Sequence, residues 1–424
     1  MSKLFKQPIV FFILADILIF TLLFLYREPA DPKILITAMI VLVLTLFTYL
    51  VITYFNWGDK YIFLIASMLV TLGIAMLYRL DYARGLKQIG WYVFGIAVFV
   101  IAFFAFRYIN FWDKIPWFYF AVSVAMFGVV QVFGRTIGGA KNWLFIGGYS
   151  IQPSEITKIL FVLFLACYFH RKDKENYRYL PEKYIMMFCA FFYCGCLILQ
   201  REWGSTVLLF AVYFLLLYIY RNDWLMLLGN IGLMGVVGFL GYKFLFHIQT
   251  RVAMWLNPWS DPSVAGYQII QSLFAIAAGD FFGTGIGLGM PQLIPYVESD
   301  FIFAAICEEL GVFGGVAVIL LFFILIYRCF KISLAQDAAD EPYLDQKSGE
   351  IVMPSGASFY KCVAVGIALM LALQTFIIIG GVVKLIPLTG ITLPFISYGG
   401  TSLLTSFAML GIIQGISAKG IKKQ

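Results

Sequence analysis

The run "FIFAAICEELGVFGGVAVILLFFILIY" (residues 301–327) decides the fold of this chain. It is long enough to cross the roughly 30 Å hydrocarbon core of a bilayer as a helix that rises about 1.5 Å per residue. Glu308 and Glu309 interrupt it, and two adjacent carboxylates cannot both face lipid. The run therefore predicts a membrane-spanning helix with at least one carboxylate directed at a basic partner or a polar cavity.

The composition of the whole chain indicates the same location. Of 424 residues, 62% are hydrophobic and 12% are charged, and the mean hydropathy is +0.90. Such a chain has too few polar side chains to cover a water-soluble globule, so we expect an integral membrane protein. The net charge of +7 lies in short clusters between apolar runs, which is typical of loops that orient spans and excludes nucleic acid as a partner. Two histidines and seven cysteines without metal-type spacing predict neither a zinc site nor a disulfide framework.

Apolar runs of sufficient length predict a polytopic, all-α helical bundle of about twelve spans. They lie near 8–26, 34–55, 61–78, 88–106, 115–133, 154–170, 184–200, 204–220, 224–246, 301–327, 359–383 and 400–417. The first run is followed by "REPADP", which offers no small-residue cleavage site, so we expect it to remain attached rather than act as a signal peptide.

The distribution of Lys and Arg predicts the orientation of these spans. Both termini are expected in the cytoplasm, because this choice places the dense cluster 171–183 and the loop 329–358 inside. Three irregular stretches then face outward: 134–153, the long segment 247–300, and 385–400. The segment 247–300 is rich in aromatic residues and glycine, so we expect it to be ordered. No internal repeat of the kind found in many transporters is evident.

Charged side chains are energetically costly at membrane depth, so each one in this chain needs an explanation. Glu155 and Lys158 lie three apart on one face of a helix that begins at Pro153. They form either a neutral pair that anchors the helix or part of a functional site, and spacing alone does not separate the two. Asp16 is interpreted as a packing or interfacial residue. Asp300 opens the helix that carries Glu308 and Glu309 about 12 Å further along.

Two further motifs lie in the outer segment. "NPWSDPSVAGYQ" (257–268) contains Asp261 in an Asp-Pro pair, which is an ordinary turn starter but lies in a segment far longer than a helix connection needs. "GTGIGLG" (283–289) lacks the strand before it and the Lys-Ser/Thr after it that a phosphate-binding loop has, so its glycines are interpreted as allowing a tight backbone.

Three blocks together resemble the SEDS family (shape, elongation, division and sporulation; RodA, FtsW and SpoVE). They are "GGAKNWLFIGGYSIQPSEITK" (138–158), "NPWSDPSVAGYQIIQSLFAIAAGDFFGTGIGLG" (257–289) with "PYVESDFIFAAICEELG" (295–311), and "LIPLTGITLPFISYGGTS" (385–402). The resemblance implies a ten-helix core over 59–418, a two-helix amino-terminal addition over 1–58 and a basic cytoplasmic tail over 419–424. We expect the addition to be dispensable for catalysis.

The resemblance also implies an activity and its residues. It predicts a peptidoglycan glycosyltransferase of the bacterial cytoplasmic membrane that polymerises lipid II on the outer face beside a class B penicillin-binding protein. Asp261 matches the family's essential aspartate and is the predicted catalytic base. The predicted substrate-binding residues are Lys141, Lys158 and Arg135 for pyrophosphate, Glu155 and Glu308 to orient them or to hold a divalent cation such as Mg or Mn, and Gln268 and Ser397.

The chain departs from the family pattern at several positions. Gln200–Gly204 keeps an acid but replaces a proline by Arg201; Asn142 stands where many members have arginine; Ile378 replaces an asparagine, and Lys384 replaces a glycine. Two other functions remain open at this stage. A transporter or flippase of lipid-linked precursors would place its essential residues at the midplane, and a non-catalytic division scaffold would tolerate neutralisation of Asp261.

Overall fold

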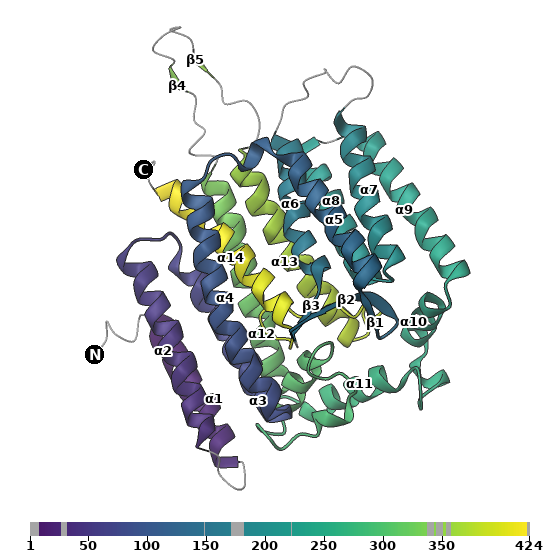
Figure 1. Ribbon diagram of the computed structural model, residues 1–424. Coiled ribbons are helices and arrows are strands. Elements are labelled where there is room, and N and C mark those ends of the chain that lie inside the picture. The colour runs from purple at the N-terminus through teal and green to yellow at the C-terminus, as the bar shows by residue number, and fades with distance from the viewer. Residues whose placement is uncertain are drawn as a thin grey trace. The chain divides into compact units, whose positions relative to one another are not determined.

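The computed structural model describes residues 8–26, 32–147, 149–170, 182–221, 223–336, 343–344, 351–352 and 358–421 (Figure 1). Its contacts divide the chain into two compact units. The first comprises 1–98, 236–325 and 374–407, and the second comprises 99–235, 326–373 and 408–424.

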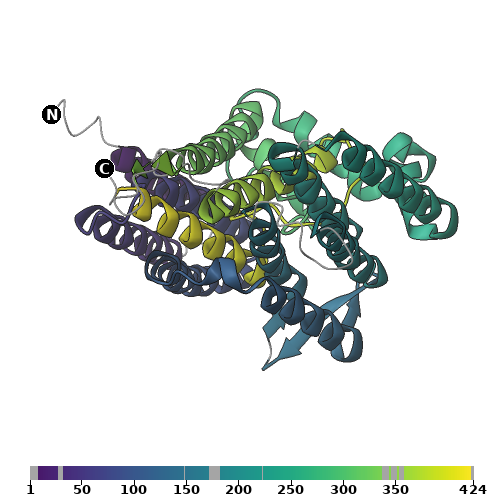
Figure 2. The same ribbon diagram turned by 90° about the horizontal axis from the view of Figure 1, so that it is seen from above.

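Within the described residues, eleven helices are long and apolar enough to cross a membrane, which confirms the polytopic helical fold. They are α1 (Pro8–Tyr26), α2 (Lys33–Tyr54), α3 (Lys60–Leu80), α4 (Tyr82–Tyr108), α5 (Pro116–Phe133), α6 (Pro153–His170), α8 (Trp203–Arg221), α9 (Trp224–Phe244), α12 (Ile302–Ala335), α13 (Phe359–Val382) and α14 (Gly400–Ile421). The predicted span near 184–200 is α7 (Glu182–Leu199), an apolar helix of similar length. Figure 1 labels these helices, and Figure 2 shows them from above.

Helix α3 is the most enclosed helix of the amino-terminal part of the first unit. Of the residues in its most apolar stretch, 83% are buried. Asp59 begins this helix, because its side chain accepts a hydrogen bond from the Tyr61 amide at 2.9 Å. The amino-terminal helices α1 and α2 pack on α3 through a core of Phe12, Tyr49 and Leu64. A residue of each of the three helices thus contributes to one apolar cluster.

The second unit contains a small sheet that the sequence analysis described only as an irregular stretch. Strands β1 (Arg135–Ile137), β2 (Ala140–Ile146) and β3 (Tyr149–Ile151) form an antiparallel sheet in the order β1-β2-β3. Gly138 and Gly139 both have positive φ, so they connect β1 to β2 by the two-residue turn that favours glycine. Residues 134–153, which were expected to be irregular, therefore contain a small sheet within an otherwise helical fold.

The outer segment 247–300 also has more regular structure than expected. Helix α10 (Phe246–Leu256) and helix α11 (Tyr267–Gly279) occupy much of it, with short 3-10 turns at Pro258–Ser260 and Pro291–Leu293. These two helices are too short to have been found by a search for membrane spans. The expectation of an ordered segment holds, and the expectation of an irregular one is wrong.

Two helix boundaries differ from the hydropathy pattern. Helix α4 begins at Tyr82 rather than near 88, because Asp81 accepts a hydrogen bond from the Ala83 amide at 2.9 Å and caps the helix. Helix α12 continues to Ala335, so it includes the first part of the predicted loop 329–358. A short strand pair, Tyr343–Leu344 with Ile351–Val352, lies in the same loop. Most of that loop, the cluster 171–181 and residues 422–424 lie outside the described residues.

Candidate functional site

Asp261 lies in a tight turn between α10 and α11. Its backbone carbonyl accepts a hydrogen bond from the Gly266 amide at 2.8 Å, and its carboxylate lies 3.4 Å from the Ala265 amide. Gly266 leaves no room for a side chain, since a Cβ there would overlap the carbonyl oxygen of Pro258. The turn therefore fixes the backbone of Asp261, whose carboxylate is only half-buried and makes a single long contact. It keeps acceptor capacity for a ligand.

The helices that flank this turn are fixed to the segment that follows α13. The Trp255 indole donates to the carbonyl of Lys384 at 3.2 Å, and Arg251 donates to the carbonyl of Leu388 at 3.0 Å. Ser272 of α11 lies 3.4 Å from the carbonyl of Val382. Lys384, which replaces a family glycine, keeps the left-handed backbone with a φ of 61°. These contacts hold both ends of the Asp261 turn.

The glycine run 283–289 wraps around the two glutamates of α12. The Gly287 amide donates to Glu309 Oε2 at 3.0 Å, and the Met290 amide donates to Glu308 Oε1 at 2.6 Å. Arg79 of α3 forms an ion pair with Glu309 at 3.0 Å and donates to the carbonyl of Gly289 at 2.8 Å. The basic partner expected for one carboxylate is therefore Arg79. The glycines allow the backbone to lie close to the two glutamates, as the sequence indicated.

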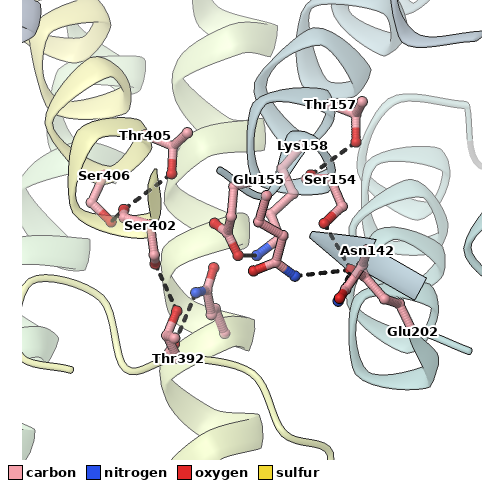
Figure 3. Close-up of polar contacts among 12 residues, drawn as sticks. Asn142, Ser154, Glu155, Thr157, Lys158, Glu202, Thr392, Ser402, Thr405 and Ser406 are labelled. Carbon is pink, nitrogen blue, oxygen red and sulfur yellow. Dashed lines mark hydrogen bonds and ion pairs between the residues drawn. The ribbon is translucent and has the colours of Figure 1, made fainter. Parts of the chain in front are cut away.

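The run "SYGG" is fixed by its neighbours in the same unit. The Ser397 hydroxyl donates to the carbonyl of Ser299 at 2.5 Å and accepts from the Leu393 amide at 2.9 Å. The residues on either side of this run are also in polar contact, since the Thr392 and Ser402 hydroxyls lie 2.6 Å apart (Figure 3). Ser397, one of the predicted substrate-binding residues, is buried and has both functions of its hydroxyl in use. Gln268 lies half-buried in the first turn of α11.

In the second unit, Glu155 and Lys158 form a buried ion pair in the first turns of α6. Lys158 Nζ lies 2.7 Å from Glu155 Oε1, and the side chains are only 1% and 6% exposed (Figure 3). The neighbouring Ser154 and Thr157 continue the polar stretch of α6, as the Thr157 hydroxyl donates to the Ser154 carbonyl at 2.8 Å. This burial makes Lys158 a positioned charge rather than a freely moving one.

Glu202, which the sequence analysis did not select, is the centre of a second buried cluster. Its Oε1 accepts hydrogen bonds from Asn142, from Gln152 at 2.8 Å and from Ser154 at 3.0 Å (Figure 3). These donors come from β2, from the residue that precedes α6 and from the first turn of α6, and Glu202 itself precedes α8. Asn142, which stands where many family members have arginine, thus contacts the acid that the chain keeps within Gln200–Gly204. The sequence marks the two positions separately and gives no sign of their contact.

The remaining predicted cations lie at the surface of the sheet. Lys141 Nζ donates to the carbonyl of Gln131 at 2.6 Å, and the Arg135 guanidinium lies 5.2 Å from the centroid of the Phe145 ring. The predicted residues therefore fall into two sets: Asp261, Gln268, Glu308 and Ser397 in the first unit, and Arg135, Lys141, Glu155 and Lys158 in the second. No group of three or more His, Cys, Asp or Glu side chains within the described ranges could hold a metal ion.

Comparison with known proteins identifies the family. The family model of FtsW, RodA and SpoVE, described as cell cycle proteins, matches residues 59–421. The peptidoglycan glycosyltransferase RodA of Mycobacterium tuberculosis is 31% identical over 387 residues, covering 85% of this chain and 78% of that protein. Stage V sporulation protein E of Bacillus subtilis is 34% identical over 380 residues, covering 85% and 96%.

Solved structures share the fold. A chain from a peptidoglycan synthase complex, described as coordinating polymerisation and crosslinking, matches with a TM-score of 0.68 and 23% identity over 86% of this chain and 98% of that chain. RodA of Thermus thermophilus matches with a TM-score of 0.59 and 21% identity over 85% and 96%. The chain therefore belongs to the FtsW, RodA and SpoVE family of cell cycle proteins, the SEDS family.

Proposed function

We propose that this chain is a peptidoglycan glycosyltransferase that polymerises lipid II at the outer face of the bacterial cytoplasmic membrane, with both termini in the cytoplasm. The observation that carries the proposal is Asp261, a half-buried carboxylate with free acceptor capacity in a rigid turn, within a chain whose family includes named peptidoglycan glycosyltransferases. The multi-pass helical fold agrees with a substrate that is anchored in the membrane.

The reaction joins two lipid-linked disaccharides. A sugar hydroxyl of one attacks the anomeric carbon of the other; the new carbon–oxygen bond forms as the bond to the lipid pyrophosphate breaks. In this proposal Asp261 accepts the hydroxyl proton, and pyrophosphate leaves with the bonding electron pair. Fixing Asp261 between α10 and α11 lowers the cost of orienting it, which is the contribution that a rigid turn makes to such chemistry.

The cationic residues have proposed roles at the leaving group. Arg135 and Lys141 are surface cations that attract the negatively charged pyrophosphate as it leaves. Lys158 is held in place by Glu155. A preorganised charge stabilises a developing anion without reorganisation during the reaction. Glu308 is assigned a positioning role, because it holds the Met290 amide after the glycine run.

A class B penicillin-binding protein is the proposed partner. The support is the resemblance to a chain of a synthase complex that coordinates polymerisation with crosslinking. The test is purified protein, with and without such a transpeptidase, incubated with lipid II while crosslinking is blocked. Glycan strands that depend on this chain support the proposal. Movement of lipid II across vesicle membranes without strand formation would instead indicate a flippase.

A further inference from the structure

The amino-terminal hairpin α1–α2 contacts the glycine run 283–289. Tyr26 is the last residue of α1, and its ring lies directly on Gly287, where a Cβ would overlap it. Gly287 is buried and has a φ of +87°, a backbone conformation that favours glycine. A ring from the hairpin thus lies on a position where any other side chain would displace it.

The backbone of Gly287 is also held on both sides by the ion pair of Arg79 and Glu309, which we call the clamp. Its amide donates to Glu309 Oε2 at 3.0 Å, and its carbonyl accepts from Arg79 at 3.2 Å. Glu309 and Arg79 are themselves an ion pair whose glutamate side chain is fully buried. The ring of Tyr26, which is 47% exposed, therefore packs against a backbone whose two polar groups are held by one ion pair. Gly287 and the Glu309 side chain are buried, and burial strengthens hydrogen bonds by keeping water away from them.

The hairpin is firmly attached to the rest of the first unit. Besides the apolar core that it shares with α3, Thr45 of α2 lies 2.7 Å from the Tyr92 hydroxyl of α4. Tyr92 in turn donates to the Ser67 hydroxyl of α3 at 3.2 Å. This buried chain of hydroxyls links α2 to both neighbouring helices. The attachment keeps α1 in register, so that Tyr26 stays on the glycine run.

We propose that α1–α2 is a positioning element and that Tyr26 acts through the glycine run on the segment that carries Asp261. The run 283–289 follows α11, and α11 follows the Asp261 turn directly. Movement of the run would displace α11 and therefore also the Asp261 turn at its other end, because a helix moves as a rigid rod. Tyr26 is thus a positioning residue, and the hairpin is not a dispensable addition. The consequence for catalysis rests on the proposed polymerase function.

Hydrogen exchange tests the contact without reference to activity. Thr284, Gly285, Gly287 and Met290 donate their amides to the two glutamates, so the 283–290 segment reports the clamp. We expect Tyr26→Ala to accelerate exchange in this segment about tenfold, by opening it locally. Tyr26→Phe keeps the ring and should exchange like the wild-type protein. Tyr54→Ala, at the exposed end of α2, removes the same side chain where it is 81% exposed and should also have no effect.

Activity gives the second readout. In lipid II polymerisation, Tyr26→Ala should lower kcat about fivefold or more with a smaller change in KM, because it disturbs geometry and not substrate contacts. Tyr26→Phe should restore both values. Unchanged exchange in 283–290 for a folded Tyr26→Ala protein would overturn the proposal. Faster exchange with normal kcat would overturn its catalytic part. Absence of polymerisation in the wild-type protein would refute the proposed function and leave the exchange result standing.

Discussion

Replacing Lys158 by methionine removes the buried ammonium that neutralises Glu155. The two charges lie 2.7 Å apart with side chains 1% and 6% exposed. At an effective dielectric constant of about 20, two unit charges at that distance attract by about 6 kcal/mol, part of which is offset by their removal from water. Leaving the carboxylate buried without the compensating ammonium costs about 3–5 kcal/mol. We therefore expect Lys158→Met to destabilise the protein by that amount.

The double variant Glu155→Gln/Lys158→Met separates this effect from loss of packing. It contains neither charge, so it should recover most of the lost stability and unfold within about 1–2 kcal/mol of the wild-type protein. The assay is reversible unfolding in detergent, followed for the wild type, both single variants and the double variant. If Lys158→Met unfolds within about 1 kcal/mol of the wild type, the pair is not the buried, water-excluded ion pair described above.

Three further predictions concern the outer segment. Gly266→Ala should cost about 1–3 kcal/mol and slow polymerisation at least about tenfold, because its methyl group would overlap the Pro258 carbonyl and shift the Asp261 turn; a normal rate would refute the tight-turn geometry. Burial raises the pKa of Asp300 from 3.8 to about 6, so the native state holds a proton that the unfolded chain has released, and stability should fall as the pH rises from 3.8 to about 6. Asp300→Asn should flatten that dependence, and an unchanged profile would contradict it. Cysteine at the exposed position Ser263 should react with an impermeant reagent added outside the cell; labelling only after lysis would reverse the proposed topology.

The helices of this protein could be predicted because the bilayer imposes a strong constraint on length and composition. The exact ends of the helices could not be predicted in this way, because the polar contacts that cap a helix do not appear in the hydropathy of the sequence. The six residues before the predicted start of α4 include Arg84 and Lys87, which lower the local hydropathy, yet the cap at Asp81 begins the helix there. Helices α10 and α11 were missed because they are too short for a search for membrane spans. They are held by contacts with residues more than a hundred positions away, such as Trp255 with Lys384.

The candidate site was predictable one motif at a time. Asp261 and the Glu155–Lys158 pair lie within continuous motifs, and their local spacing was visible. Glu202 was missed because its partners come from other elements: Asn142 is separated from it by 60 residues and Ser154 by 48. A carboxylate that accepts three hydrogen bonds from distant segments is recognisable only after those segments are brought together. The contact of Tyr26 with Gly287 has the same origin.

The central claim is that Asp261 is the base of a polymerising glycosyltransferase. The most direct measurement is the rate of glycan-strand formation from lipid II, with transpeptidation blocked, by the Asp261→Asn protein. Asp280→Asn is the matched control, since Asp280 directly follows α11 in the same segment and asparagine keeps the size and shape of its side chain. We predict that Asp261→Asn folds normally and loses about a hundredfold or more in rate while Asp280→Asn does not. Near-normal polymerisation by a folded Asp261→Asn protein would contradict the account.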